Sequence, residues 1–378
     1  MNPPEHDVRQ SLDRLAAAAK GGRELAFMEV CGTHTTAAFR CGLPSVLPRH
    51  VKLISGPGCP VCVTAQQDID LLVEAAGRQG VTLCTYGDMI RVPGRRGSLQ
   101  EARGRGARVH VVYSAMDAVA LAQAHVDRQV VFAAVGFETT APATAAAVQA
   151  ARRRGLTNFT VLNSHKRIVP AMQALLERGA KMKDGLGIDG FVCPGHVSVI
   201  IGARAYLPLA RDYAAPCVIS GFEPWQMISA LARLAELAQS GRAEVINEYP
   251  EVVSPDGNRA AQKLLDEVFQ PAETRWRGLG LIAQSAWVLR PAWREFDAQV
   301  RFGLTPPEDC EPKACLCGKV ISGLALPTDC SLFGRSCTPL QPVGPCMVSS
   351  EGTCAAWFKY SWRQAPHRPL PILAGASP

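Results

Sequence analysis

The feature that most constrains this chain is a group of cysteines near its C-terminal end. Thiols on a Gly- and Pro-rich, irregular backbone suit a soft metal, and sulfur-only ligation with long, uneven gaps favours an iron–sulfur cluster. Zinc ribbons usually show two close Cys-x-x-Cys pairs, and this region has none. Seven of the fourteen cysteines lie in the last seventy residues: Cys310, Cys315, Cys317, Cys330, Cys337, Cys346 and Cys354.

The length and the N-terminal residues set the frame for this site. A chain of 378 residues is longer than one core usually supports, which predicts two or three domains. Residues 1–7 lack the basic and apolar regions of a secretory signal, so we expect a cytoplasmic protein whose thiols serve metal or redox chemistry. The net charge of +7 is modest. The Arg-rich patches at 91–108 and 152–154 lack interleaved aromatics, and we interpret them as solvated surface.

The first two-thirds of the chain shows repeated strand–turn–helix units. Short apolar runs predict strands at 25–30, 51–55, 81–86, 109–114, 130–135, 159–163 and 217–220. Helical patterns lie between them at 64–78, 115–124, 142–153 and 170–178. This alternation predicts an α/β fold of doubly wound layers with parallel sheets. Because the units exceed what one sheet holds, we expect two similar α/β domains that divide near residue 115.

The remaining residues predict a third, helical and cysteine-rich domain that holds the iron–sulfur cluster. Helical patterns at 225–239 and 258–269 open this part of the chain. The expected plan is an N-terminal helix over 1–24 packed on the third domain, α/β domains over 25–115 and 116–222, the third domain over 223–363, and a Pro-rich tail over 364–378.

Two of the strand-end turns carry cysteines. Ligands of open α/β sheets bind beyond the carboxyl ends of the strands, where helix N-termini point at them. Cys31 follows the first predicted strand, where a helix N-terminus would favour its thiolate, and His34 lies one turn further on. The alternative is a buried cysteine followed by a capping Thr33. Cys59 and Cys62 form a Cys-x-x-Cys pair at the next junction, which indicates either a redox dithiol or a metal site.

Two further turns carry titratable side chains. Glu138 follows a predicted strand, and helix capping explains Thr139 and Thr140 but not this carboxylate. Glu138 is therefore a candidate for a polar or acid–base role. His196 lies in a Pro-Gly-His turn, where a single histidine is more often structural than a ligand.

Together these turns resemble those of one family, the hydrogenase maturation proteins HypD, over nearly the whole chain. Five motifs carry the resemblance: Cys31-Gly-Thr-His-Thr, Gly56-Pro-Gly-Cys-Pro-Val-Cys62, Gly136-Phe-Glu-Thr-Thr140, Pro194-Gly-His-Val197 and Met347-Val-Ser-Ser-Glu-Gly-Thr-Cys354. The family's four-cysteine spacing, with intervals of fourteen, six and sixteen residues, selects Cys315, Cys330, Cys337 and Cys354. Cys317 remains an alternative to Cys315, whereas Cys310 and Cys346 lie outside the pattern.

The resemblance implies a role in building the Fe(CN)2CO unit of [NiFe]-hydrogenase. It implies a [4Fe–4S] cluster in the C-terminal domain, a complex with the small chaperone HypC, transient contact with the cyanide donor HypE, and indirect contact with the hydrogenase large subunit. Carried over by motif, Cys31 binds the iron under assembly jointly with a HypC cysteine, and Cys59 and Cys62 form a redox dithiol between that iron and the cluster. The family's other polar positions are matched by His34, Glu138 and His196.

The residues themselves agree with such a role. A thiolate anchors the soft iron centre that cyanide and CO require, and thiol–disulfide exchange can carry electrons toward it. We therefore expect an assembly scaffold with redox activity rather than a turnover enzyme, without nucleic-acid or membrane partners. Two other functional classes explain the residues less well. An iron–sulfur-dependent thiol–disulfide oxidoreductase leaves Cys31 and His34 unexplained, and an iron–sulfur sensor of nucleic acid requires a helix-turn-helix or an aromatic–basic surface that the sequence lacks.

Overall fold

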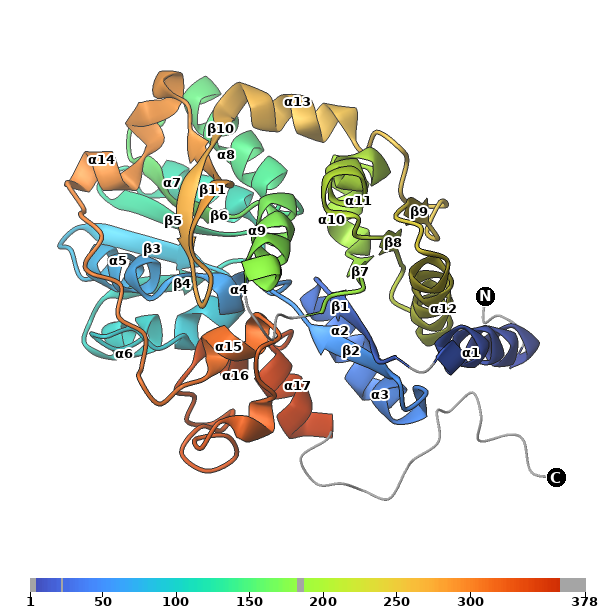
Figure 1. Ribbon diagram of the computed structural model, residues 1–378. Helices are drawn as coiled ribbons and strands as arrows, with labels where there is room; N and C mark the ends of the chain where they lie inside the picture. Colours follow the sequence, from blue (N-terminus) through green and yellow to red (C-terminus); the bar gives the residue numbers. More distant parts are fainter. Residues whose placement is uncertain (1–4, 22, 182–186, 361–378) are drawn as a thin grey trace.

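Two parallel β-sheets and one antiparallel hairpin form the framework of the chain (Figure 1). This computed structural model describes residues 5–21, 23–181 and 187–360, so the Pro-rich tail predicted over 364–378 lies outside the described residues. The predicted α/β class with parallel sheets is confirmed. No helix among these residues is long and apolar enough to cross a membrane.

The first sheet has five parallel strands and a helical layer on one face. In spatial order the strands are β2 (Val51–Ser55), β1 (Leu25–Glu29), β7 (Gly190–Cys193), β8 (Cys217–Ile219) and β9 (Val245–Asn247). The long helix α12 (Pro224–Ser240) packs on β7 and β8, and α1 (Glu5–Ala18) packs on α12. Arg14 and Glu236 join these two helices at 2.8 Å.

The second sheet has four parallel strands with helices on both faces (Figure 1). Its order is β4 (Arg108–Val111), β3 (Val81–Thr85), β5 (Gln129–Gly136) and β6 (Phe159–His165). The middle strands are buried on both faces, and β5 accordingly has a continuous apolar run. The helices around this sheet include α5 (Gln66–Ala76), α6 (Leu99–Gly104), α7 (Ala115–Ala124), α8 (Ala141–Arg153) and α9 (Ile168–Lys181).

The strands do not pair according to the predicted division near residue 115. That boundary runs through the second sheet, because β3 and β4 before it pair with β5 and β6 after it. The chain starts the first sheet with β1 and β2, builds the whole second sheet, and then returns to the first with β7. Both halves show the same strand–helix pattern, so the sequence does not reveal which strands are neighbours.

The region predicted as a third domain over 223–363 is also divided differently. Helix α12 and strand β9 belong to the first sheet and its cover, and a hairpin of β10 (Phe269–Trp276) and β11 (Gly280–Leu289) packs beside β6. The helix α13 (Arg259–Val268) packs on α8. The predicted N-terminal helix therefore packs on a layer of the first sheet.

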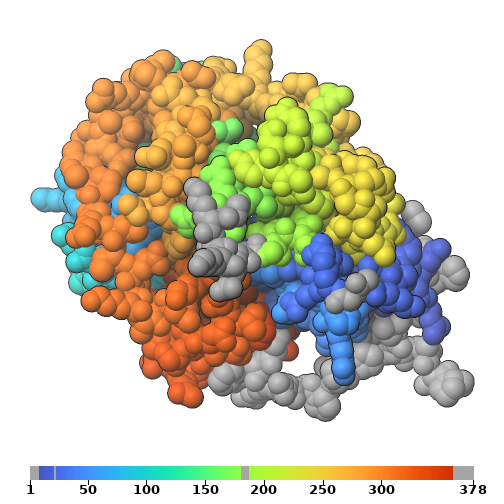
Figure 2. Space-filling model, in the orientation of Figure 1, coloured from blue at the N-terminus to red at the C-terminus, as the bar shows by residue number. Residues whose placement is uncertain are grey.

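The cysteine-rich residues form short helices and irregular backbone at one end of the two sheets (Figures 1 and 2). Their helices are α15 (Cys317–Ile321), α16 (Pro345–Val348) and α17 (Thr353–Tyr360). Other helices are α2 (Gly32–Arg40), α3 (Leu43–Val46), α4 (Pro60–Val63), α10 (Gly195–Ile201), α11 (Leu207–Tyr213) and α14 (Ala298–Phe302). The 3₁₀ turns are Ala19–Gly21, Gly87–Arg91, Ala203–Tyr206, Pro291–Phe296 and Pro327–Asp329.

Candidate functional site

The turns that carry Cys31 and Cys59 lie against each other. They follow the neighbouring strands β1 and β2, whose last residues Glu29 and Ser55 are register partners. The backbone N–H of Gly32 donates to the Gly58 carbonyl at 3.2 Å. A Cβ on Gly58 would lie 2.1 Å from the backbone nitrogen of Cys31, so the two turns can approach this closely only with glycine there.

Cys31 is buried at the N-terminus of α2. Its backbone N–H donates to Glu29 Oε2 at 3.0 Å, and the Thr35 hydroxyl donates to Oε1 of the same carboxyl group. Burial raises the pKa of the Cys31 thiol to about 12, although the N–H groups of His34 and Thr33 at the helix start lower it. The expectation that the helix N-terminus favours a thiolate is therefore corrected, because desolvation outweighs the helix.

The second acidic group beside Cys31 comes from the C-terminal segment. The Thr33 hydroxyl donates to Glu351 Oε1 at 2.7 Å, so Thr33 binds this segment instead of capping α2. A Cβ on Gly32 would lie 2.6 Å from the Cβ of Glu351. Burial raises the pKa of Glu29 to about 8, and the charge of Glu351 adds to that shift.

His34 and His196 both pack against the ring of Phe222. Their ring centroids lie 4.8 and 4.2 Å from that of Phe222. His34 is buried, and its Nε2 lies 2.9 Å from the Gly221 carbonyl; since a carbonyl only accepts, Nε2 carries the proton and Nδ1 the lone pair. That Nδ1 is buried without a partner. Burial lowers the pKa of His34 to about 4, so the ring is neutral at neutral pH, whereas His196 is exposed.

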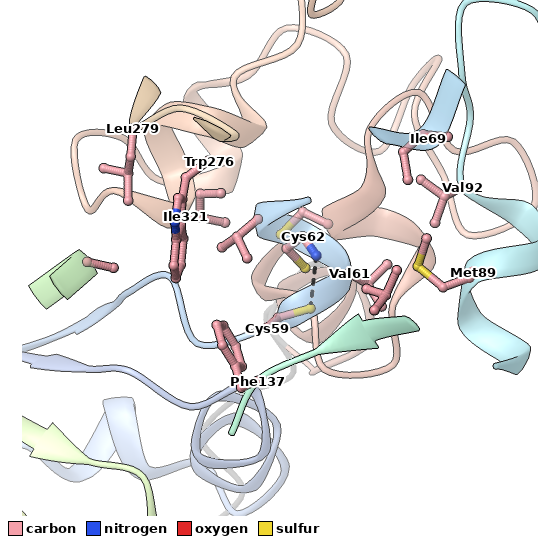
Figure 3. Close-up of a cluster of buried hydrophobic side chains, with 14 of the residues drawn as sticks. Cys59, Val61, Cys62, Ile69, Met89, Val92, Phe137, Trp276, Leu279 and Ile321 are labelled. Carbon is pink, nitrogen blue, oxygen red and sulfur yellow. Dashed lines mark hydrogen bonds between the residues drawn. The ribbon is translucent and has the colours of Figure 1, made fainter. Parts of the chain in front are cut away.

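The predicted dithiol lies in the core beneath this edge (Figure 3). Cys59 precedes the short helix α4, and its Sγ accepts the N–H of Cys62 at 3.3 Å. The Cys59 thiol also donates to Ser349 Oγ at 3.3 Å, and Ser349 in turn donates to Asp88 at 3.2 Å. Residues from three distant parts of the chain therefore fix the position of the Cys59 sulfur.

Six of the C-terminal cysteines line one small cavity, called here the cysteine cage: Cys315, Cys317, Cys330, Cys337, Cys346 and Cys354. The four cysteines that the spacing selects are thus brought together, and Cys310 is exposed and lies outside the cage. The cavity has a volume of about 10 Å³. A Cβ on Gly344 would lie 2.7 Å from Cys315 Sγ, so the cage needs glycine at this position.

Cys346 connects the dithiol with the cage. Burial raises the pKa of Cys62, and the neighbouring thiols of Cys346 and Cys59 raise it further. The Cys346 thiol also interacts with Cys317 and Cys354, and its Sγ accepts the N–H of Cys354 at 3.2 Å. Thiol groups therefore run without interruption from Cys59 to the cage. Sequence spacing alone missed this role because the partners of Cys346 lie far apart in the chain.

Glu138 lies at the carboxyl end of the second sheet. Its Oε1 accepts the N–H of Ile168 at 3.1 Å, while Oε2 is buried without a partner. Burial raises the pKa of Glu138 to about 7. The preceding Phe137 packs against Trp276 and lies close to Cys59 in Figure 3. Glu138 is thus near the dithiol turn, but the structure gives it no hydrogen bond to a predicted site cysteine.

All fourteen cysteines are free thiols, and six of them line the cage. Across residues 5–21, 23–181 and 187–360, no group of three or more His, Cys, Asp or Glu side chains is arranged to hold a single metal ion. A larger cavity of about 630 Å³ lies at the amino ends of β3 and β4, lined in part by Arg78, Arg105 and Arg108, and it contains none of the predicted site residues.

Comparison with known proteins identifies the family. A family model described as HypD, hydrogenase formation HypA family, matches residues 6–361. The chain is 48% identical to the hydrogenase maturation factor HypD of Azotobacter vinelandii over 355 residues, which cover 93% of this chain and 94% of that protein. It is 46% identical over 349 residues to the HypD of Cupriavidus necator, covering 92% of each, and 42% identical over 362 residues to that of Escherichia coli, covering 96% and 95%. The chain therefore belongs to the HypD family of hydrogenase maturation factors.

Proposed function

We propose that this protein is the scaffold on which the Fe(CN)2CO unit of [NiFe]-hydrogenase is assembled and reduced in the cytoplasm. The observation that carries this proposal is the continuous arrangement of the Cys31 turn, the Cys59–Cys62 dithiol and the cysteine cage. A thiol–disulfide oxidoreductase would need the dithiol and the cage, but it would give no role to Cys31 and His34 on the adjoining turn.

In this proposal the iron under assembly is the substrate, and Cys31 is its anchor. A soft thiolate suits iron that carries cyanide and CO. Because Cys31 is a thiol in the metal-free protein, iron binding must release its proton. Cys31 is 7% exposed, so a small chaperone of the HypC type can supply its own cysteine only by docking at the edge formed by α2 and the exposed His196. A cyanide donor of the HypE type would meet the same edge.

The cysteine cage fits a [4Fe–4S] cluster by its chemistry. Its donor atoms are thiols alone, without carboxylate or imidazole, which is the donor set of such clusters. We propose Cys315, Cys330, Cys337 and Cys354 as the ligands, with Cys317 as the alternative to Cys315. A bound cluster would supply electrons one at a time.

The other residues of the site would exchange thiol and disulfide states with the dithiol or bind and release protons near it. Cys346 belongs to the cage and lies beside Cys62, so it could exchange thiol and disulfide states with Cys62, and Cys317 lies next to Cys346. The neutral His34 offers an unpartnered Nδ1 at the Cys31 turn. Glu138, whose pKa of about 7 lies near neutral pH, is placed to take up or release a proton near the dithiol.

The experiment that tests this function replaces Cys31 by Ser. Serine keeps nearly the same volume but removes the soft ligand, so the fold and the distant cysteine cage should be retained. Protein purified anaerobically with its HypC-type partner should then lose the infrared bands of iron-bound cyanide and CO, and [NiFe]-hydrogenase should remain immature.

Cys41→Ser is the matched control. Cys41 ends the same helix, and its thiol donates only to the Ala38 carbonyl at 3.4 Å. This variant should keep the infrared bands. If Cys31→Ser keeps them as well and still supports hydrogenase activity, Cys31 is not the iron ligand.

A further inference from the structure

Arg277 is a buried cation without an acidic partner. It is 1% exposed, at the turn between β10 and β11. Its guanidinium donates to the Thr64 carbonyl at 3.1 Å and to Gln66 Oε1 at 3.4 Å, both neutral oxygens. Among the described residues no carboxylate forms an ion pair with it. Burying an unpaired charge costs free energy, so we expect an anion close to this guanidinium.

The acidic groups around this turn are already engaged. Asp309 faces Arg275 at 3.9 Å, and Asp68 pairs with Lys166 at 3.3 Å. Glu311 accepts the N–H of Gly278 at 3.0 Å. None of these carboxylates therefore serves Arg277 as its counter-ion.

Arg277 lies between the dithiol helix and the cysteine cage. Its backbone N–H donates to Val63 at 2.9 Å, directly after Cys62. On its other side, Gly278 has a φ of +70°, and a Cβ there would lie 2.4 Å from the Cα of Gly318, the residue after Cys317. Figure 3 shows the flanking Trp276 and Leu279 beside this part of the core.

The packing brings Arg277 next to the cage. Its neighbour Gly278 contacts Gly318, and Cys317, the residue before Gly318, lines the cage. Once the cysteines of the cage are thiolates, the cage can therefore serve as the anionic partner of this guanidinium.

We propose that Arg277 is the counter-charge of the cysteine cage and raises the reduction potential of the iron–sulfur cluster held there. Four thiolates give such a cluster a net negative charge, and reduction adds one more electron. A fixed cation in a low-dielectric surrounding therefore favours the reduced state. The inference rests on the proposed function, because it takes the cage as the cluster site. Arg277 acts through the cluster's surroundings and touches no substrate.

The test compares Arg277→Gln, which removes the charge but keeps an amide donor, with Arg277→Lys, which keeps the charge. Redox titration by electron paramagnetic resonance should show a lower midpoint potential in Arg277→Gln, by at least a tenfold change in the oxidised-to-reduced ratio, or about 59 mV for one electron. Arg277→Lys should lie near the wild type. The rise in melting temperature on cluster loading should also shrink in Arg277→Gln.

Arg178→Gln is the matched control. Arg178 is exposed and donates to the Gly278 carbonyl at 3.5 Å and to the Leu279 carbonyl, so its loss loosens the same turn without removing the buried charge. It should leave the potential and the stabilisation by the cluster unchanged. An unchanged potential in a cluster-loaded Arg277→Gln protein, or an equal change in Arg178→Gln, would overturn the role of Arg277. If the wild-type protein itself contained no iron and sulfide, the cage would not be a cluster site, and this inference would be wrong as well.

Discussion

At the scale of single residues, burial sets the protonation states of the site. Cys31, His34 and Glu138 are each buried, and in each case desolvation is the largest cause of the pKa shift toward the neutral form. The sequence motifs predicted which residues gather at the strand ends. They did not predict these protonation states, because the favourable effect of a helix N-terminus can be read from the chain whereas the depth of burial cannot.

Burial of another residue, His165, predicts a pH dependence of stability. Its Nε2 lies 2.8 Å from the Thr144 hydroxyl, its Nδ1 has no partner, and burial lowers its pKa to about 3. As the pH falls, His165 binds a proton near pH 6.5 in the unfolded chain but not in the folded protein. The stability that the neutral, buried His165 contributes is therefore complete above pH 6.5 and falls as the pH drops toward 3. Between pH 7 and pH 5 the loss should be about 2 kcal/mol.

Urea unfolding of His165→Gln at pH 7 and pH 5 measures this contribution. The variant should lose about 2 kcal/mol less than the wild type between the two pH values. The exposed His50 provides a control as His50→Gln, which should follow the wild type. An identical pH dependence in His165→Gln and wild type would mean that His165 is protonated equally in the folded and unfolded chains.

At the scale of elements, local sequence patterns predicted most of the strands and the longer helices, but neither the short helices nor the pairing of the strands. The helix at 115–124 and the strand at 51–55 agree with the structure to the residue. The short strand β7 was missed, and with it the return of the chain to the first sheet. The hairpin over 269–289 was also missed, because polar residues interrupt the apolar runs of its half-exposed strands. Strand order depends on contacts between distant segments, which periodicity does not report.

The close contact between the first two turns gives a prediction at this scale. Gly58→Ala would place a Cβ 2.1 Å from the Cys31 nitrogen, and backbone on both sides must shift to relieve the clash. We expect a loss of about 1–3 kcal/mol in the free energy of unfolding. The infrared bands of iron-bound cyanide and CO should also weaken, because the Cys31 and Cys59 turns move apart.

Gly104→Ala is the control for this prediction. Gly104 ends α6, and a Cβ there meets nothing within 4 Å. Denaturant unfolding should show it to be as stable as the wild type or slightly more stable. If Gly58→Ala were equally harmless in both measurements, the close packing of the two turns would not matter for the site.

At the scale of the whole molecule, the site is assembled from segments that lie far apart in the chain, and local sequence patterns do not show which of them meet. The four-cysteine spacing predicted Cys315, Cys330, Cys337 and Cys354, and the fold brings these residues around one cavity. Their role as cluster ligands stays a prediction. The placement of Cys346 beside Cys62 depends on how the C-terminal segment docks at one end of the two sheets. No local pattern carries that information.

The position of Cys346 predicts that electrons pass from the cage to the Cys59–Cys62 dithiol through this thiol. Cys346→Ala removes the cage thiol that lies beside Cys62 while the four selected ligands remain, so iron and sulfide contents should stay at the wild-type level. Reducing an oxidised Cys59–Cys62 pair takes two electrons and two protons, and without the intermediate thiol this reduction should slow at least tenfold.

The measurement is to oxidise the protein mildly, add dithionite, quench with an alkylating reagent at intervals, and count free Cys59 and Cys62 by mass spectrometry. Cys310→Ala, which removes an exposed cysteine outside the cage, should reduce at the wild-type rate. An unchanged rate in Cys346→Ala would show that electrons reach the dithiol without this thiol. Loss of iron from Cys346→Ala would instead make Cys346 a cluster ligand, and the ligand set chosen by spacing would have to be revised.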